Sequence, residues 1–286
     1  MKRKLCLFAL ILTLVCGSLI LPRTAGAITY GFVDSTNAFA NTGAFIARAP
    51  NGEIFPICSG TMVTSNVFLT ASHCTVAFDE EWAPFGYTAF VSLDGLIPFG
   101  ALSSGATNLL PVAHLVTNPN YKQSQGDSGD IAVLILQNHV AGVTPVQLPT
   151  CGLLEELSAQ NGLKHAIFTP VGYGVQNRIT GGGNPFFTDA NPIPRMFAFS
   201  SFNSLNKGYL RLSQNPSTGN GGTCFGDSGG PNFMTVDGEE IQVAITITGD
   251  SVCRSTNVGY RLDIASAQAF LASVNTAFGT SIPVTC

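Results

Sequence analysis

The chain has 286 residues, of which only 10% are charged, and it carries 31 glycines and 16 prolines. This length is enough to bury a sizeable core, and the many turn formers favour short strands over long helices. The formal net charge of −4 argues against a protein that binds nucleic acid through a basic patch.

Residues 1–27 have the pattern of a secretory signal peptide. A basic start, MKRK, is followed by an apolar run of 17 residues and by the small residues AGA at 25–27. Cleavage there makes Ile28 the first residue of a secreted chain, and it lowers the formal charge from −4 to −8 because four basic residues are removed. The alternative is a retained membrane anchor, which the short apolar run disfavours.

Short apolar or β-branched runs separated by turn residues predict strands through the rest of the chain. In the first half they are GAFIA, SGTMV, VFLTA, TAFVSL, VAHLV and IAVLIL. In the second half they are AIFTPVGYG, MFAFSSF, GYLRL, IQVAITI and VGYRL. Two runs of about six strands predict an all-β protein with two antiparallel barrels or sandwiches, at 28–150 and 151–286, connected through 148–163.

Only the C-terminal segment 263–278 has helical spacing. Its apolar stripe consists of Ile264, Ala267, Phe270, Leu271, Val274 and Phe278. We expect a surface helix that docks on the second barrel.

Six cysteines follow the signal segment, an even number that suits an oxidising compartment: Cys58, Cys74, Cys151, Cys224, Cys253 and Cys286. Their number alone does not select a pairing. A zinc site is the competing interpretation, but no CxxC or CxH spacing brings them together. The acids of FDEEW at 78–82 sit in one short loop without an EF-hand pattern, so we predict no metal and no cofactor.

The tetrapeptide GDSG occurs twice, at 126–129 and at 226–229. A catalytic serine needs a base to take its proton, a group that orients the base, and donors that face the developing oxyanion. The first copy runs directly into a buried strand, so Ser128 is interpreted as a turn residue. The second lies in the longer motif CFGDSGGP and contains Ser228.

The candidate base comes from only four histidines. His73 lies in FLTASHC, where an apolar strand ends and a cysteine follows. The other three, His114, His139 and His165, are interpreted as ordinary surface or hydrogen-bonded residues.

Three segments resemble the catalytic motifs of trypsin-like and chymotrypsin-like serine proteases. SGTMVTSNVFLTASHC resembles the segment around their catalytic histidine, DIAVLIL their aspartate-bearing strand, and GGTCFGDSGGP their nucleophile loop. The segments occur in the family's order, and VGYGV at 171–175 is similar to the strand that opens its second barrel. The resemblance spans nearly the whole chain after residue 27. It implies two antiparallel Greek-key β-barrels with a C-terminal helix and an active site in the cleft between the barrels.

Carried over residue by residue, the resemblance makes Ser228 the nucleophile and His73 the general base and then acid, with Asp130 orienting the imidazole. The backbone amides of Gly226 and Ser228 would form the oxyanion hole. The resemblance implies a secreted, monomeric serine endopeptidase that acts on proteins or peptides, needs no cofactor and is open to proteinaceous inhibitors. It also implies the disulfides Cys58–Cys74 and Cys224–Cys253, with Cys151–Cys286 as the remaining pair.

In this family a new amino terminus, usually isoleucine, inserts beside the aspartate that precedes the nucleophile. Ile28 stands 45 positions before His73, close to the separation that the family shows. We therefore expect Ile28 to pair with Asp227 without a separate propeptide. The alternative is that Ile28 is the first residue of a frayed strand.

The resemblance also places the substrate pocket, with Asp250 at its rim, at Gly222, Thr223, Thr248, Gly249 and Val258. No aspartate stands at position 222, so it implies a preference for apolar or aromatic residues before the scissile bond over Lys or Arg. Ile247 stands where the family has a serine that supports the catalytic aspartate. Thr246 or Thr248 would supply that support if the register is shifted by one.

Two other classes of protein are open. A non-enzymatic secreted binding protein can share this fold, although all three triad residues are present here; labelling of Ser228 by a fluorophosphonate would distinguish the two. An esterase of another fold would place GxSxG between a strand and a helix, whereas a proline and strand-like sequence follow Ser228.

Overall fold

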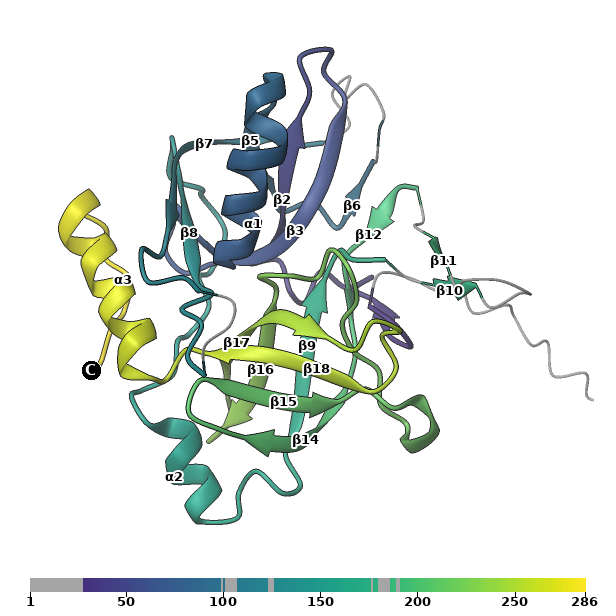
Figure 1. Cartoon of the computed structure of the whole chain (residues 1–286), viewed down its shortest axis with the longest axis vertical. Coiled ribbons are helices and arrows are strands. Elements are labelled where there is room, and N and C mark those ends of the chain that lie inside the picture. Colours follow the sequence, from purple (N-terminus) through teal and green to yellow (C-terminus); the bar gives the residue numbers. More distant parts are fainter. Residues whose placement is uncertain are drawn as a thin grey trace, which may run out of the picture.

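The computed structural model describes residues 28–98, 100, 107–122, 126–175, 177–179, 186–188 and 191–286. The predicted signal peptide, residues 1–27, lies outside the described residues. Figure 1 shows two β-barrels, one above the other, with the C-terminal helix along one side.

The first barrel is a closed ring of antiparallel strands in the order β2-β3-β4-β8-β7-β5. Its strands are β2 (Thr42–Arg48), β3 (Ile54–Met62), β4 (Val67–Thr70), β5 (Thr88–Ser92), β7 (Leu110–Thr117) and β8 (Ala132–Leu136). Each overlaps one of the runs predicted in the first half of the chain, although β3 begins five residues before its run SGTMV. The strand β8 is buried over its whole length because β4 and β7 pair with its two edges.

The second barrel closes where β9 pairs with β16, and it also has six antiparallel strands. They are β9 (Ile167–Gly172), β14 (Ser200–Leu205), β15 (Tyr209–Ser213), β16 (Pro231–Val236), β17 (Glu239–Gly249) and β18 (Thr256–Arg261). The prediction of two antiparallel barrels is confirmed.

Short strands extend or connect the barrels: β1 (Phe32–Val33), β6 (Leu96–Ile97), β10 (Asn177–Ile179), β11 (Phe186–Thr188), β12 (Ile193–Pro194) and β13 (Met196–Phe197). The pair β6–β12 joins residues of the two halves. Strand β1 pairs with β13, and Thr29 forms a bridge with Gly222. Residues 29–33 therefore lie against the second barrel, although the expected boundary placed them with the first.

Helices are few and short. A continuous helical segment follows β4, made of α1 (Ser72–Ala77), the π-helical turn η1 (Phe78–Trp82) and the 3-10 turn η2 (Ala83–Phe85). The prediction of a short loop at 78–82 was thus wrong. The others are α2 (Leu153–Ala159), within the expected connector, the turn η3 (Pro216–Thr218), and α3 (Ala265–Phe278).

The helix α3 has the predicted extent, but it reaches across to the first barrel. Phe278 contacts His114 of β7, with ring centroids 5.1 Å apart, and Ser266 Oγ donates to Asp127 at 2.6 Å. Its buried apolar residues share one cluster with Phe45 and other residues of the first barrel. The expected docking on the second barrel alone was therefore wrong, and α3 packs against both halves of the fold (Figure 1).

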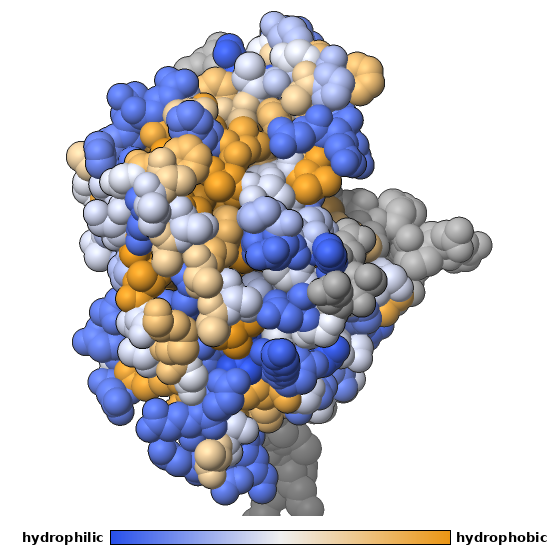
Figure 2. All heavy atoms as spheres, turned by 60° about the vertical axis from the view of Figure 1, so that its left-hand side comes forward, coloured by the Kyte–Doolittle hydropathy of each residue, from blue (hydrophilic) through white to orange (hydrophobic). Residues whose placement is uncertain are grey.

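The surface beside α3 interleaves hydrophilic and hydrophobic residues (Figure 2), as the surfaces of folded proteins usually do. In the part of the chain that the structure describes, none of the helices has the length and apolar character needed to cross a membrane.

Candidate active site

The three residues of the expected triad come from three separate elements. His73 is the second residue of α1, Asp130 lies just before β8, and Ser228 lies in the loop that leads into β16. The buried Ser72 hydroxyl donates to the carbonyl of Ile131 at 2.7 Å. This bond ties the start of α1 to the start of β8, so the histidine and the aspartate are held side by side.

His73 and Asp130 are joined by two hydrogen bonds. The backbone N–H of His73 donates to Asp130 Oδ1, and His73 Nδ1 lies 2.9 Å from Oδ2, the same distance as in the backbone bond. The histidine side chain is 24% exposed and that of the aspartate 7%. With Nδ1 engaged by the carboxylate, Nε2 is the ring nitrogen left to exchange a proton with a substrate or nucleophile.

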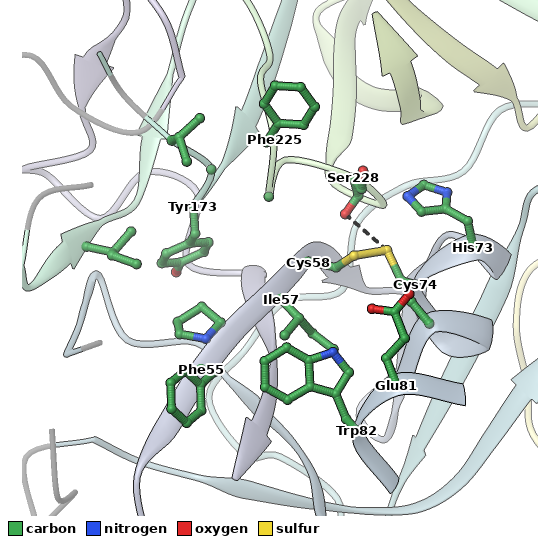
Figure 3. A pocket seen from close by; sticks show the side chains of 16 residues that line it. Phe55, Ile57, Cys58, His73, Cys74, Glu81, Trp82, Tyr173, Phe225 and Ser228 are labelled. Carbon is green, nitrogen blue, oxygen red and sulfur yellow. Dashed lines mark hydrogen bonds between the residues drawn. A yellow bond between two sulfur atoms is a disulfide. The ribbon is translucent and has the colours of Figure 1, made fainter. Parts of the chain in front are cut away.

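Ser228 is anchored by its backbone next to this pair. Its carbonyl accepts from Ser59 N–H at 2.8 Å, and Ser59 Oγ donates to the carbonyl of Gly226 at 3.0 Å. Figure 3 shows Ser228 and His73 beside one another above the Cys58–Cys74 disulfide. Among the described residues no hydrogen bond joins Ser228 Oγ to His73.

The loop before Ser228 makes a tight turn at Gly226. Gly226 has a φ of 93°, which L-residues with a side chain rarely adopt. No protein acceptor is found, within the described ranges, for the backbone N–H of Gly226 or of Ser228. Two amides left free in one tight turn can donate to a developing oxyanion.

Asp227, between these two amides, is a fully buried carboxylate. It accepts from Gly174 N–H at 2.8 Å and from Cys224 N–H at 2.9 Å, and no cation contacts it in the part of the chain that is described. Burial raises the pKa of Asp227 to about 7 although these two hydrogen bonds oppose the shift. Ile28 is also fully buried, in an apolar cluster with Tyr173, but the described contacts do not join it to Asp227.

The family model of trypsin matches residues 32–271, which is most of the chain. This chain belongs to the trypsin family. Membership supports a serine-protease type of function, with proteins as the class of substrate.

Three disulfides stabilise this member of the trypsin family: Cys58–Cys74, Cys151–Cys286 and Cys224–Cys253. The first holds α1 against β3 directly below the candidate site, and Cys74 Sγ lies 3.8 Å from the carbonyl oxygen of Ser228 (dashed line in Figure 3). That contact is not a hydrogen bond, because a disulfide sulfur carries no hydrogen. For the same reason the cluster of Cys58, Cys74 and His73 offers no thiolate to a metal.

A cavity of about 330 Å³ adjoins Ser228 where the trypsin family resemblance predicted the substrate pocket. Of the five predicted residues, Thr223, Thr248 and Gly249 line it. Gly222 and Val258 are not among the lining residues. Gly222 is buried against the side chain of Gln214, which a Cβ at that position would overlap.

The predicted rim residue Asp250 also lines this cavity, and its carboxylate accepts four hydrogen bonds from neighbouring residues. It accepts from the backbone N–H groups of Arg254, Ser255 and Thr256 and from Gln214 Nε2. Burial acts to raise the pKa of Asp250, yet these hydrogen bonds outweigh it and the pKa is lowered. The group is therefore ionised at neutral pH and holds its own loop in shape.

The described hydrogen bonds join neither of the alternatives for supporting Asp130, Thr246 and Thr248, to its carboxylate. Ile247, which stands in the place of the family's serine, lines the 330 Å³ cavity, and the hydroxyl of Thr246 accepts from Asn232 Nδ2 at 3.1 Å. In the described structure, Thr248 forms no bond to the Asp130 carboxylate either. His73 is thus the side chain that satisfies this carboxylate in the described site.

Sequence reasoning missed a second cavity that also borders Ser228. It has a volume of about 550 Å³ and is lined by Phe55, Trp82 and Tyr173 as well as by His73 and Ser228. These aromatic residues are far apart in the chain, and although Tyr173 lies in VGYGV, no sequence pattern indicated that it meets Phe55 and Trp82.

Proposed function

We propose that this protein is a secreted serine endopeptidase in which His73, Asp130 and Ser228 form the catalytic triad. The observation that carries the proposal is the doubly bonded His73–Asp130 pair beside Ser228, with the free amides of Gly226 and Ser228 in the same loop. Each group needed for acyl transfer is therefore present within one site.

The proposed reaction has two steps. His73 Nε2 removes the proton from Ser228 Oγ as that oxygen attacks the scissile carbonyl, and the amides of Gly226 and Ser228 bind the oxyanion. The imidazolium, stabilised by Asp130, then gives the proton to the leaving amine, which departs and leaves an acyl-enzyme. A water molecule, deprotonated by the same histidine, attacks the ester, and the imidazolium gives the proton to Ser228 Oγ as the C–O bond breaks and the acid is released.

We propose that cleavage after residue 27 activates the enzyme. The new ammonium of Ile28 would pair with Asp227. This carboxyl is buried, its pKa is raised, and it has no cationic partner among the described residues. Ile28 already lies in the apolar cluster that contains Tyr173, the neighbour of Gly174. Pairing would lower the pKa of Asp227, because the opposite charge favours the carboxylate.

For the residue before the scissile bond we propose a non-basic, apolar or aromatic preference. The 330 Å³ cavity has Ile247 and Phe225 in its lining, and its acid, Asp250, accepts three hydrogen bonds from its own loop and one from Gln214. A cation in the pocket would therefore compete with these donors for that carboxylate. We also propose that residues 28–150 and 151–286 form the two halves of one monomeric peptidase domain.

The alternative is a catalytically weak or inactive secreted binding protein on the same fold. Two observations favour it: the described Ser228 Oγ forms no hydrogen bond to His73, and Ile247 offers no bond to Asp130. Hydrolysis of a peptide library by the secreted protein and by its Ser228→Ala variant separates the two. Turnover that disappears in the variant supports the peptidase, whereas no turnover by the secreted protein supports the binding protein.

A further inference from the structure

Two cavities adjoin Ser228 and differ in what borders them. Phe225 and Ser228 line both, so they form the boundary between the cavities. His73 and the Cys58–Cys74 disulfide line only the larger one. A peptide that crosses Ser228 must therefore place its two ends in different surroundings.

The position of His73 decides which end goes where. In acyl transfer the histidine protonates the leaving amine, so the leaving part of the substrate lies on the histidine's side of the nucleophile. The larger cavity is on that side. It is thus positioned to receive residues that follow the scissile bond, while the smaller cavity receives the residue before it.

The wall of the larger cavity is aromatic. The rings of Phe55 and Trp82 are 5.6 Å apart, and Trp82 meets Tyr87 edge-on at 5.0 Å. Tyr173 faces them from the second barrel, and Figure 3 shows the side chains of Phe55, Trp82 and Tyr173 grouped on the side of the cavity away from His73. A preformed aromatic wall of this kind binds large apolar groups.

This wall exists because the helix that begins at Ser72 does not stop after His73. It continues through η1, which carries Trp82 over Phe55 on β3. The same turn brings Glu81 to the cavity, and Glu81 is the one acidic residue among the described lining residues. An acidic side chain in the cavity would be repelled by it.

We propose that this cavity binds a large apolar or aromatic side chain from the first two residues after the scissile bond, and that it disfavours an acidic one. The inference rests on the proposed peptidase function for its biological meaning. Binding in the cavity, however, can be measured without catalysis.

Trp82 makes that measurement direct, because it is the only tryptophan in the chain. The protein with Ser228→Ala, beginning at Ile28, is titrated with three peptide amides that have a free amino end, as a leaving group does: Phe-Leu-amide, Gly-Gly-amide and Asp-Gly-amide. Trp82 emission is followed in each titration, and this comparison needs no substitution in the cavity.

Phe-Leu-amide is expected to shift the emission at a concentration about tenfold lower, or less, than Gly-Gly-amide, since one aromatic side chain leaves water. Asp-Gly-amide is expected to bind more weakly than either. Phe55→Ala should bring the first two amides within about twofold of one another. The matched control is Phe85→Ala, on the same helical segment but 73% exposed and outside the lining, which should leave the preference unchanged.

Equal titration midpoints for Phe-Leu-amide and Gly-Gly-amide would overturn the inference. So would the absence of any change in Trp82 emission in protein that is shown to be folded by its cooperative unfolding. So would a loss of preference in Phe85→Ala as large as in Phe55→Ala. Hydrolysis is scored separately with Ser228 present. Preferential binding without hydrolysis would support the proposed binding preference and reject the peptidase function. Hydrolysis without preferential binding would support the peptidase function and reject the binding preference.

Discussion

Raising the pH from 5 to 8 should destabilise the form of the protein that keeps residues before Ile28. The same change of pH should not destabilise, through Asp227, the form that begins at Ile28. The cause is Asp227, whose pKa burial raises from 3.8 to about 7. A carboxyl with a higher pKa in the folded than in the unfolded chain binds more protons when folded. Its contribution to stability is fully present below the unfolded pKa and is lost as the pH rises through the folded pKa.

These two pKa values set the size of the effect. Between pH 5 and pH 8 the free energy of unfolding should fall by roughly 2.5 kcal/mol through this one group. For a domain of this size, that corresponds to roughly 5–10 °C in Tm. With a terminal ammonium of Ile28 beside it, the pKa of Asp227 would lie low, and the loss over this range would disappear.

The assay is thermal unfolding at pH 5 and pH 8 of two forms, one with residues retained before Ile28 and one released from a fusion so that it starts there. Both carry Ser228→Ala to prevent self-cleavage. Each form is compared with its own Asp227→Asn variant, so that only the contribution of Asp227 is scored. Two results would refute the reasoning. One is a fall in Tm in the longer form that is equally large with Asp227 and with Asp227→Asn, and the other is a fall due to Asp227 that persists in the form that begins at Ile28.

Three further effects are expected. Asp130→Asn should keep the fold but lower kcat on the order of 10⁴-fold, because His73 loses its orienting partner, as measured with a fluorogenic peptide. Replacing Cys151 and Cys286 by serine frees a loop of 135 residues and should cost roughly 3–5 kcal/mol in urea unfolding. Arg195→Met leaves the fully buried Asp34 without its ion-pair partner and should cost roughly 3–5 kcal/mol, part of which Asp34→Leu should restore.

The strands were predictable where apolar runs end at turn residues. All six strands of the first barrel have that form, and the fully buried β8 is the clearest case. The strand β16 was missed because it starts at Pro231, directly behind the nucleophile loop. Proline is tolerated there as the first residue of the strand, although it pairs with Ile245 on β17.

The helix α3 shows what an apolar stripe leaves open. The spacing of Phe270, Leu271 and Val274 predicts that one face is buried, but it carries no information on which barrel covers that face. The contacts of Ser266 with Asp127 and of Phe278 with His114 depend on tertiary structure, not on local pattern.

The candidate site divides in the same way. His73, Asp130 and Ser228 each sit in a local motif, and the structure brings the three together. The pocket depends on side chains from other segments of the chain. Gln214 fills the space beside Gly222, so Gly222, which the family resemblance placed in the pocket, does not line the cavity. The aromatic wall of Phe55 and Trp82 arises from a helical continuation that the sequence pattern had indicated as a loop.

The most direct test of the catalytic site is the reaction of the protein that begins at Ile28 with a fluorophosphonate, followed by peptide mapping of the adduct. The triad predicts one modified residue, Ser228, and loss of labelling in both Ser228→Ala and His73→Ala. Labelling at Ser128 in the other GDSG segment, or labelling of Ser228 that is as fast without His73 as with it, would contradict the assignment.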